Sequence, residues 1–408
     1  MKSKLISVIG LGYIGLPTAA LLASHGYTVV GTDISQHAVE TINHGKIHIV
    51  EPDLDAYVRS AVMAGRLKAS TLPQAGDVYM ICVPTPFHEG GAIPQPNIDY
   101  VLAATRSIAT FVKPGDLVIL ESTSPVGTTE QMQVVLREAG VNVEEVHIAY
   151  CPERVLPGKI MTELVENDRV VGGMNPVSTE KVADFYRTFV SGVVLETDAK
   201  TAEMCKLSEN SFRDVNIAFA NELSLICDKA GINVWNLIQL ANRHPRVNIL
   251  EPGAGVGGHC IAVDPWFIVA RDVENAKLIR TAREVNNHKT DWVIDKIKIA
   301  AADATTKSGS KPTIACLGLA FKPDIDDLRE SPALHVALAL KSQGYDVIAV
   351  EPNIDSHDCF HVVGLEQALE SAEVIAVLVK HRQFVEHRIW QQLSAKAALD
   401  FCGALRET

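Results

Sequence analysis

The sequence has no long apolar run, no cysteine pair and no cluster of basic residues. A bilayer-spanning helix needs roughly 20 consecutive apolar residues, so we expect no association with a membrane. Lys and Arg total 37 against 49 Asp and Glu, which gives a net charge of −12. Because nucleic-acid binding needs a basic face, we expect no nucleic-acid partner, and any site for an anionic ligand must be locally basic.

The eight cysteines are scattered singly, at positions 82, 151, 205, 227, 260, 316, 359 and 402. This spacing excludes the usual zinc patterns and a disulfide framework, so we expect no metal and a reduced, cytoplasmic protein. Lys2 and Lys4 precede an apolar stretch, from Leu5 to Ala23, that imitates an export signal. A strand, a loop and a helix explain the same stretch better.

The composition is that of an ordinary globular protein, with 47% hydrophobic and 21% charged residues in 408 positions. Short apolar runs alternate with helical patterns in the first half, which predicts an α/β fold with a doubly wound parallel sheet. The expected strands cover residues 5–9, 28–31, 77–83, 116–120, 147–150, 168–173 and 192–196.

The pattern changes at Thr201, after which no Gly or Pro occurs before Gly231. This stretch predicts a helix of about 45 Å that joins domains or forms a subunit interface. TKSGSKP at 306–312 is the best candidate for a linker. Strands at 313–317, 346–350 and 374–379 and a helix at 332–342 then restore the βαβ pattern. We therefore predict two Rossmann-like domains, residues 1–198 and 313–408, joined by a central helical segment, 199–305. No internal repeat is expected, because the second domain lacks the glycine pattern of the first.

Gly10, Gly12 and Gly15 form a GxGxxG motif between the first strand and the first helix. Such a loop brings a pyrophosphate to the backbone and to the helix N-terminus. Asp33 follows 18 residues after Gly15, at the end of the second strand, where a carboxylate binds ribose hydroxyls. No Arg follows to receive a 2′-phosphate, so NAD is favoured over NADP. The alternative is a glycine turn with a capping Asp.

Four glycines within six positions, 253–258, precede Cys260. Glycines are costly in conformational entropy and suit a backbone that closely approaches a ligand. Cys260 is expected at the N-terminus of a helix, which favours a thiolate, with Asp264 on the same helical face. A thiolate beside a carboxylate suits covalent catalysis followed by hydrolysis, whereas the alternative is a buried, inert thiol.

Lys206 and Asn210 are four residues apart on the expected long helix and share one of its faces, as a site or as an ordinary surface pair. The segments 83–86 and 122–127 follow strand ends, where open α/β sheets bind their ligands, but they could equally be rigid turns.

Seven ordered motifs along the whole chain resemble those of the UDP-glucose/UDP-N-acetylmannosamine 6-dehydrogenase family. They are GLGYIGLP at 10–17, CVPTP at 82–86, ESTSPVGTT at 121–129, PERVLPG at 152–158, EMCKLSEN at 203–210, PRVNILEPGAGVGGHCIAVDPW at 245–266 and LGLAFKPDIDDLRESPAL at 317–334. UDP-glucose enzymes carry a second Glu where this chain has Pro157. The Glu-Arg-x-x-Pro-Gly version resembles the branch that oxidises N-acetylhexosamine nucleotides. The resemblance as a whole implies UDP-N-acetyl-D-mannosamine as the substrate, for enterobacterial common antigen or a related surface polysaccharide.

The resemblance implies a four-electron oxidation of C6, from alcohol to acid, with two NAD. Cys260 matches the nucleophile that forms a thiohemiacetal and then a thioester. Lys206 matches the residue that stabilises the oxyanion, and Asn210 its neighbouring donor. The remaining matches are Asp264 and Thr123, for the catalytic water and proton relay, and Glu153, for a base in later steps.

The resemblance also implies the binding residues and assigns NAD to the first domain and the UDP-sugar to the last. The cofactor set is Gly10, Gly12, Tyr13, Ile14, Gly15, Asp33, Pro84, Thr85, Thr123 and Arg329. The substrate set is Arg154, Val155, Leu156, Lys206, Asn210, Arg213, Arg246, Asn248, Gly255, Gly257, Phe321 and Lys322. Arg246 is implied to reach the site of the partner subunit in a homodimer, which fits the long helix as an interface.

Other readings remain open. UDP-N-acetylglucosamine or UDP-glucose would be alternative substrates. A β-hydroxyacid dehydrogenase shares the nucleotide domain and a Lys-Asn helix but performs one oxidation without a cysteine, and a nucleotide sensor would perform none. Cys260 and the second α/β domain argue against the single-oxidation enzyme.

Overall fold

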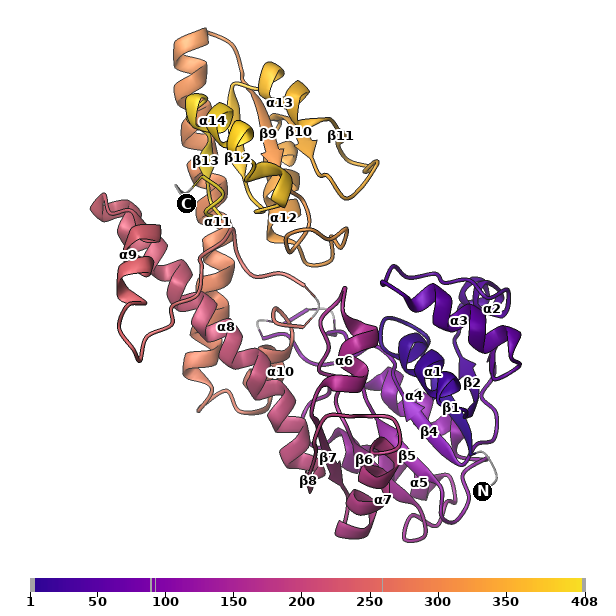
Figure 1. Cartoon of the computed structure of the whole chain (residues 1–408). Helices are drawn as coiled ribbons and strands as arrows, with labels where there is room; N and C mark the ends of the chain where they lie inside the picture. The colour runs from indigo at the N-terminus through magenta and orange to yellow at the C-terminus, as the bar shows by residue number, and fades with distance from the viewer. Residues whose placement is uncertain (1–3, 89, 92, 259, 406–408) are drawn as a thin grey trace. The chain divides into compact units, whose positions relative to one another are not determined.

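The computed structural model describes residues 4–88, 90–91, 93–258 and 260–405. The chain divides into two compact units, Met1–Ser208 and Glu209–Thr408, called here the N-terminal and C-terminal units. Each contains a sheet covered by helices, as Figure 1 shows. The predicted α/β class with two Rossmann-like sheets is therefore confirmed.

The N-terminal unit has an eight-stranded sheet in the order β3-β2-β1-β4-β5-β6-β7-β8. The strands are β1 (Leu5–Ile9), β2 (Thr28–Thr32), β3 (Leu67–Ser70), β4 (Val78–Ile81), β5 (Leu117–Leu120), β6 (His147–Tyr150), β7 (Arg169–Gly173) and β8 (Val194–Asp198). The helices are α1 (Gly15–Ser24), α2 (Gln36–Asn43), α3 (Leu54–Met63), α4 (Asp99–Ile108), α5 (Thr128–Glu138), α6 (Ile160–Glu166) and α7 (Pro176–Tyr186). Strand order reverses direction between β1 and β4, and ligands of open α/β sheets bind at such a point.

Two strands, β7 and β8, run against the expectation of a parallel sheet. β7 pairs with β6 in antiparallel fashion, and β8 is parallel to β7. The link between β6 and β7 returns along one edge of the sheet, and the Asn167 side chain closes it by donating to the Arg154 carbonyl at 2.9 Å. Both ends of this link therefore lie at the same edge of the sheet. β7 starts at the edge where β6 ends and runs in the opposite direction.

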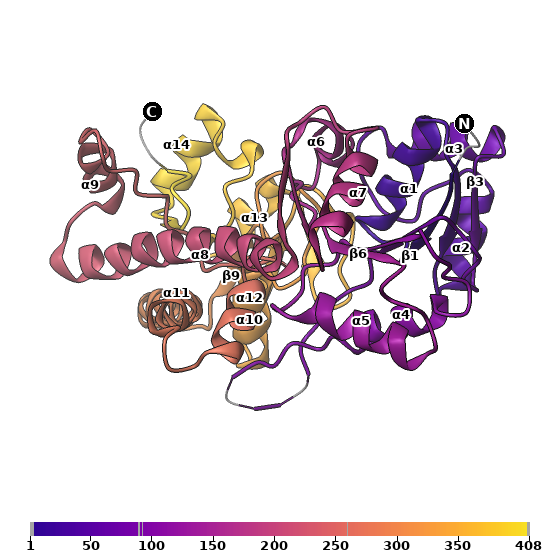
Figure 2. The same cartoon turned by 90° about the horizontal axis from the view of Figure 1, so that it is seen from below.

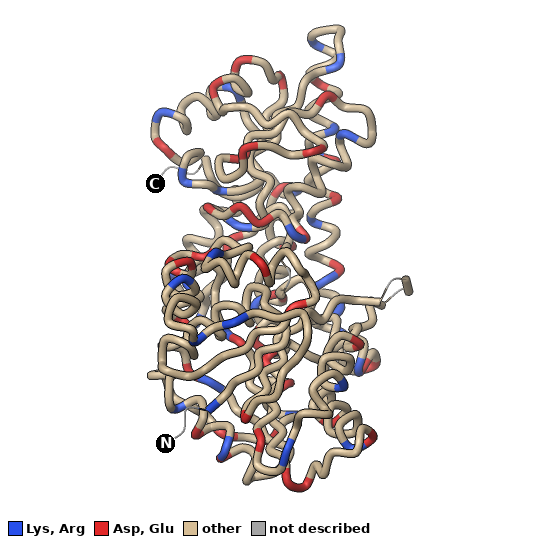
Figure 3. Tube along the Cα trace, turned by 90° about the vertical axis from the view of Figure 1, so that its right-hand side faces the viewer, with Lys and Arg blue, Asp and Glu red and all other residues tan. Residues whose placement is uncertain are grey.

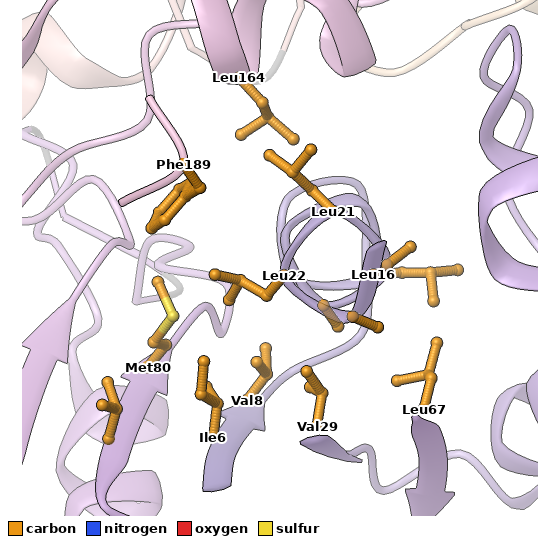
Figure 4. Packing of buried hydrophobic residues seen from close by; sticks show 14 of the residues in the cluster. Ile6, Val8, Leu16, Leu21, Leu22, Val29, Leu67, Met80, Leu164 and Phe189 are labelled. Carbon is orange, nitrogen blue, oxygen red and sulfur yellow. The ribbon is translucent and has the colours of Figure 1, made fainter. Parts of the chain in front are cut away.

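The core of the N-terminal unit lies between α1 and the strands around β1. Figure 4 shows Leu22 of α1 above Val8 and Leu16 near Leu67, while Leu21 points toward Leu164 of α6. Leu16 and Leu22 are fully buried. Truncating one such leucine to alanine typically costs about 2–5 kcal/mol. This packing fixes the start of α1, and with it the glycine loop that precedes it.

The predicted long helix is confirmed as α8 (Ala199–Ala230), which begins in the N-terminal unit and continues into the C-terminal unit. A second helix of 32 residues, α11 (Lys277–Ser308), was not predicted, although it too contains no Gly or Pro. α11 takes up the first half of the expected linker 306–312 and ends at Gly309, whose φ is +73°. The linker is therefore shorter than predicted.

α11 crosses α8 within the C-terminal unit, as Figures 1 and 2 show. Three buried polar pairs join the two helices: Arg283 Nη1–Asp214 Oδ1 at 2.7 Å, Asn221 Nδ2–Asn286 Oδ1 at 2.8 Å and Lys289 Nζ–Ser224 Oγ at 2.7 Å. Pairs of this kind fix the register of the crossing, because each buried partner would be unsatisfied after a shift.

The C-terminal unit also holds a five-stranded parallel sheet in the order β11-β10-β9-β12-β13. Its strands are β9 (Thr313–Leu317), β10 (Asp346–Val350), β11 (His361–Val362), β12 (Val374–Val377) and β13 (Leu399–Asp400). Its other helices are α9 (Val234–Ala241), α10 (Asp264–Arg271), α12 (Pro332–Ser342), α13 (Leu365–Ser371) and α14 (His387–Ala395).

The surface carries both signs of charge. Figure 3 shows Lys and Arg interspersed with Asp and Glu along both units. No helix among the described residues combines the length and the apolar character that crossing a bilayer requires.

Candidate active site

The loop between β1 and α1 has the geometry of a phosphate-binding turn. Gly10 has φ +91°, and a Cβ there would lie 2.7 Å from the Cys82 carbonyl oxygen. A Cβ at Gly15 would lie 1.8 Å from the Gly10 oxygen, whereas one at Gly12 would meet nothing within 4 Å. Gly10 and Gly15 are therefore needed for the turn itself, and Gly12 leaves open backbone for a ligand. These residues fit the pyrophosphate of a dinucleotide.

Asp33, the first residue after β2, braces this loop. Its Oδ2 accepts from the Leu11 N–H at 2.9 Å and its Oδ1 from the Ser35 N–H at 2.9 Å. The carboxylate is half-buried, so it keeps an open side for ribose hydroxyls. Tyr13 and Ile14, two other predicted cofactor residues, are half-buried in the last positions before Gly15.

The loops after β4 and β5 are joined by side-chain hydrogen bonds. Thr85 Oγ1 donates to the Thr123 carbonyl oxygen at 2.6 Å, and Ser122 Oγ donates to the Val83 carbonyl oxygen at 2.6 Å. Pro84 is exposed beside them. The structure thus brings together three predicted residues, Pro84, Thr85 and Thr123, at the strand ends beyond the glycine loop.

A buried polar cluster beneath these loops was not foreseen from the sequence. Glu121 accepts from Tyr186 Oη at 2.6 Å and from Cys82 Sγ at 3.3 Å. Burial and the neighbouring charge of Glu153 raise the pKa of Glu121 to about 7. Glu121 stands at the head of the predicted ESTSPVGTT motif, but its partners come from distant parts of the chain.

Glu153 belongs to the same buried region. Its Oε2 pairs with Arg169 Nη1 at 2.6 Å, and its Oε1 accepts from the Arg154 N–H at 2.6 Å. Both side chains of the ion pair are almost fully buried. In this arrangement the Glu153 carboxylate orients the start of the 153–158 loop, and a role as base requires it to exchange these partners.

The predicted substrate residues Arg154, Val155 and Leu156 follow on this loop. Arg154 Nη1 donates to the Asp168 carbonyl at 3.1 Å, Val155 packs against the core, and Leu156 is exposed. Glu51, which the sequence did not single out, closes the loop at its far end. Its two carboxylate oxygens accept from the Gly158 and Ile160 N–H groups, both at 2.8 Å.

Helix α8 carries the next predicted pair, Lys206 and Asn210, both buried and one turn apart. Glu203, one turn before Lys206, accepts from Thr129 N and Oγ1 at 2.8 and 2.7 Å and from Gly127 N at 2.6 Å. Burial raises the pKa of Glu203. This carboxylate fixes the start of α8 to the start of α5, the helix that follows Thr123.

Asn210 and Asp264, two predicted catalytic residues, meet directly in the C-terminal unit. Asn210 Nδ2 donates to Asp264 Oδ2 at 2.6 Å, and both side chains are buried. Asp264 is the first residue of α10. Its backbone N–H donates to the Cys260 carbonyl at 2.8 Å, so Cys260 lies one turn ahead of the pair.

Cys260 was expected at the start of a helix running from residue 261, but α10 begins three residues later, at Asp264. Cys260 lies instead in the turn 260–263 that leads into α10, because Pro265 favours the first turn of a helix. The thiol remains half-buried and close in sequence to the helix N-terminus.

The glycine-rich segment before Cys260 packs closely on other parts of the C-terminal unit. A Cβ at Gly255 would lie 2.3 Å from Thr290 Oγ1, one at Gly257 2.4 Å from the Glu330 carbonyl oxygen, and one at Gly258 2.8 Å from the Phe321 ring. The segment is also anchored by Asn221, which accepts from the Gly253 N–H at 2.9 Å. The glycines are therefore explained first by packing against α11 and the loop after β9.

The remaining predicted residues lie on two loops and on α8. Arg246 and Asn248 are exposed on a loop that Asn242 closes through hydrogen bonds to both the N–H and the carbonyl of Ile249, at 2.7 and 3.0 Å. Arg213 is exposed on α8. 

The loop after β9 holds Phe321, Lys322 and Arg329. Phe321 and Lys322 are half-buried, and Arg329 Nη2 pairs with Asp327 Oδ2 at 2.6 Å. Any anion bound by Arg329 competes with this pairing.

Sequence comparison places these features in a family. Residues 4–190 match the NAD binding domain of the UDP-glucose/GDP-mannose dehydrogenase family, residues 200–288 its central domain and residues 315–407 its UDP binding domain. The chain therefore belongs to this family of NAD-dependent nucleotide-sugar dehydrogenases. The resemblance seen in the motifs is confirmed, and so is NAD as the cofactor of the first domain.

Individual relatives are similar along nearly the whole length. A UDP-N-acetyl-D-mannosamine dehydrogenase of Escherichia coli (strain K12) is 57% identical over 402 residues, covering 94% of this chain and 95% of the relative. An NDP-N-acetyl-D-galactosaminuronic acid dehydrogenase of Ralstonia nicotianae is 54% identical over 395 residues, covering 93% and 92%. Among solved structures, a UDP-D-ManNAc dehydrogenase from Pyrococcus horikoshii has a TM-score of 0.89 at 38% identity, covering 99% of this chain and 96% of that one.

Proposed function

We propose that this chain is an NAD-dependent dehydrogenase that oxidises C6 of UDP-N-acetyl-D-mannosamine from alcohol to carboxylate. Similarity at 57% identity to an enzyme named for that sugar supports the substrate. The observation that carries the chemistry is the turn in which Cys260 precedes Asp264, with Asp264 held by Asn210. The product, a nucleotide-linked aminouronic acid, would serve synthesis of enterobacterial common antigen or a related surface polysaccharide.

NAD, when bound, accepts one hydride in each oxidation, so two are consumed per sugar. Gly10, Gly12 and Gly15 would hold its pyrophosphate and Asp33 its adenosine ribose. Tyr13, Ile14, Pro84, Thr85, Thr123 and Arg329 complete the proposed cofactor set. The open backbone at Gly12 and the half-buried Asp33 carboxylate support this fit.

The proposed reaction proceeds through a covalent link to Cys260. The first oxidation removes a hydride from C6 and a proton from its hydroxyl, giving an aldehyde. The Cys260 thiolate adds to the aldehyde carbon to form a thiohemiacetal, and loss of a second hydride gives a thioester. Water then attacks the thioester, which releases the carboxylate and restores the thiol. The covalent link explains how both oxidations occur without release of the aldehyde.

The other catalytic residues are proposed to manage charge and protons. Lys206 stabilises the negative oxygen that develops on C6, an effect typically worth a few kcal/mol. Asn210 donates to the same oxygen or holds Asp264, and its 2.6 Å bond to Asp264 supports the second role. Asp264 and Thr123 hold the hydrolytic water and relay protons. Glu153, paired with Arg169, is better placed to orient the 153–158 loop than to act as a base.

The UDP-sugar would be bound mainly by residues that supply the positive charge a diphosphate requires. We propose Arg154, Arg213, Arg246 and Lys322 for this role. Val155, Leu156, Asn248, Gly255, Gly257 and Phe321, together with Lys206 and Asn210, complete the substrate set.

We further propose that the chain forms a homodimer through α8. Phe212, Phe219 and Ile226 are 70%, 51% and 57% exposed and follow one another at seven-residue intervals. Seven-residue spacing places them on one face of the helix, and exposed apolar stripes of this kind mark interfaces. Arg246 of each subunit would reach the site of its partner.

Subunit mixing tests the shared site. Cys260→Ala and Arg246→Ala chains should each be inactive alone. After random exchange, half of the molecules are heterodimers with one complete site, so about a quarter of wild-type activity should return. Absence of any recovery, with exchange verified, would mean that each site is built from one chain.

A panel of nucleotide sugars tests the substrate. UDP-N-acetyl-D-mannosamine should give a higher kcat/KM than UDP-N-acetylglucosamine, UDP-N-acetylgalactosamine or UDP-glucose. A preference for the galacto sugar would instead favour the activity for which the Ralstonia relative is named.

The cytoplasm is the proposed location. The eight cysteines, all among the described residues, are free thiols, as a reducing compartment would keep them.

A further inference from the structure

The two sheets of the chain repeat one arrangement, although the sequence suggested no repeat. The order β3-β2-β1-β4-β5 of the first sheet corresponds to β11-β10-β9-β12-β13 of the second, and all of these strands are parallel. The glycine that follows the first strand is Gly10 in one and Gly318 in the other, each with φ +91°. Each donates its N–H at 2.8 Å to the last residue of the neighbouring strand, Thr32 or Val350.

The acidic residue of the dinucleotide fold also has a counterpart. Asp33 directly follows β2 and accepts from the Leu11 N–H at 2.9 Å. Glu351 directly follows β10 and accepts from the Leu319 N–H at 2.8 Å. The loop after β9 therefore occupies the place that the glycine loop has in the first domain. The ribose-binding carboxylate of that domain corresponds to Glu351.

The carboxylate of Glu351, unlike that of Asp33, has all its acceptor positions taken by hydrogen bonds within the protein. Its Oε2 accepts from the Leu319 and Ala320 N–H groups at 2.8 and 2.9 Å and from His381 Nε2 at 3.0 Å. Its Oε1 accepts from the Asn353 N–H and side-chain amide at 3.1 and 3.0 Å. Burial alone would raise the pKa of Glu351, but the His381 and backbone hydrogen bonds lower it to about 2. No lone pair of this carboxylate is left for a ribose.

His381 is fully buried and joins Glu351 to the other end of the same loop. Its Nδ1 accepts from the Asp324 N–H at 2.9 Å, so this nitrogen carries no proton. Its Nε2 lies 3.0 Å from a carboxylate oxygen and must therefore carry one. The partners thus fix the neutral Nε2–H tautomer. Asp324 has φ +61°, and its own Oδ1 accepts from the Arg382 N–H at 3.1 Å.

These contacts hold a short segment at both ends. Glu351 fixes the backbone of Leu319 and Ala320, and His381 fixes that of Asp324. Between them lie Phe321 and Lys322, the residues assigned to the UDP-sugar. A glycine turn built for a dinucleotide would present open backbone, whereas this one presents Phe321 and Lys322 on a backbone that is fixed on both sides.

We propose that His381 is a positioning residue that, through Glu351 and the Asp324 backbone, holds Phe321 and Lys322 in place for the uridine diphosphate of the substrate. This inference rests on the proposed function, because it assumes that the loop after β9 binds the nucleotide half of a UDP-sugar.

The test is the affinity of the full-length protein for UDP, measured by calorimetry. His381→Asn keeps an acceptor near the Nδ1 position and loses the donor to Glu351, while His381→Gln keeps a donor and loses the acceptor. Each should weaken UDP binding by about tenfold, as the loss of one buried hydrogen bond predicts. NAD affinity should be unchanged in both. His335→Gln, at an exposed position on α12 of the same domain, is the matched control and should bind UDP like the wild type.

Unchanged UDP affinity in the His381 variants would overturn the inference, and so would equal losses of UDP and NAD binding, which would indicate a general structural role. Failure of the wild type to bind UDP would refute the proposed function instead. If the His381 variants do not fold, Asn353→Ala removes only the side-chain amide that contacts both Glu351 and His381. A selective loss of UDP affinity in that variant supports the inference, and no loss overturns it.

A spectroscopic readout tests the tautomer directly. In protein labelled with 15N-histidine, the signal missing from His381→Gln identifies His381. It should show one protonated and one bare ring nitrogen at neutral pH, with the proton on Nε2. A doubly protonated ring, or a proton on Nδ1, would contradict the arrangement.

Discussion

Replacing Glu51 with glutamine should weaken the binding of the UDP-sugar while sparing NAD. The Glu51 carboxylate accepts two backbone hydrogen bonds at 2.8 Å, from Gly158 and Ile160, and is 5% exposed. Hydrogen bonds to a charged group contribute about 1.5–3 kcal/mol each. Glutamine keeps one accepting oxygen but turns an NH₂ group toward the second N–H. One bond is lost and one buried donor is left without a partner.

The expected cost is therefore about 2–3 kcal/mol, which corresponds to a loss of about 30- to 150-fold in affinity if all of it falls on ordering the loop. The loop at stake carries Arg154, Val155 and Leu156. Steady-state kinetics should show a raised KM for the UDP-sugar and an unchanged KM for NAD. Glu166→Gln, at an exposed position on α6, is the matched control and should behave like the wild type. An unchanged KM for the UDP-sugar in a folded Glu51→Gln protein would refute the reasoning.

Three further predictions concern cofactor choice, stability and the covalent step. Asp33→Ser should erode the preference for NAD over NADP in kcat/KM, and wild-type use of both cofactors at equal efficiency would contradict the assignment of Asp33. Burial lowers the pKa of Lys289 from 10.5 to about 7, so the folded state loses stability as pH falls from about 10.5 to 7. Lys289→Met should therefore raise the free energy of unfolding at pH 6. The expected increase is about 2 kcal/mol after allowing for the lost contacts to Trp292 and Ser224. This gain in stability should vanish above pH 10.5. Denaturant unfolding across this pH range measures the gain, with Lys307→Met, at an exposed position on the same helix, as control. Destabilisation at every pH would show that the contacts outweigh the charge. Cys260→Ser should still bind NAD but turn over poorly, because an ester hydrolyses more slowly than a thioester. The intact mass of this variant after incubation with substrate and NAD should reveal a covalent adduct. Rapid turnover without an adduct would argue against the covalent step.

Local sequence patterns are sufficient to predict those elements whose conformation is set by residues within the same short segment of the chain. The β1–loop–α1–β2 unit is an example, because Gly15 packs on the Gly10 carbonyl and Asp33 accepts from the Leu11 N–H, both within that unit. The same holds for α8, which lacks Gly and Pro throughout. α11 carries the same signal, because its 32 residues also lack Gly and Pro, so the sequence contains enough information to predict it.

Other features depend on residues far apart in the chain, and no pattern in a single sequence reveals such pairing. Glu51 meets a loop more than 100 residues away, and Glu121 meets Tyr186 across 65 residues. The antiparallel direction of β7 goes with a link that is closed by the Asn167 contact to Arg154, 13 residues apart, and this contact is not a turn motif. The correspondence of Gly318 and Glu351 with Gly10 and Asp33 was hidden because the second domain keeps only the first glycine.

The number of NADH molecules formed per UDP-N-acetyl-D-mannosamine consumed tests the central claim most directly. With the sugar limiting and NAD in excess, absorbance at completion should correspond to two NADH per sugar, and the product should carry a C6 carboxylate. One NADH per sugar would place the chain with enzymes that perform a single oxidation, and none would leave it as a nucleotide-binding protein without this activity.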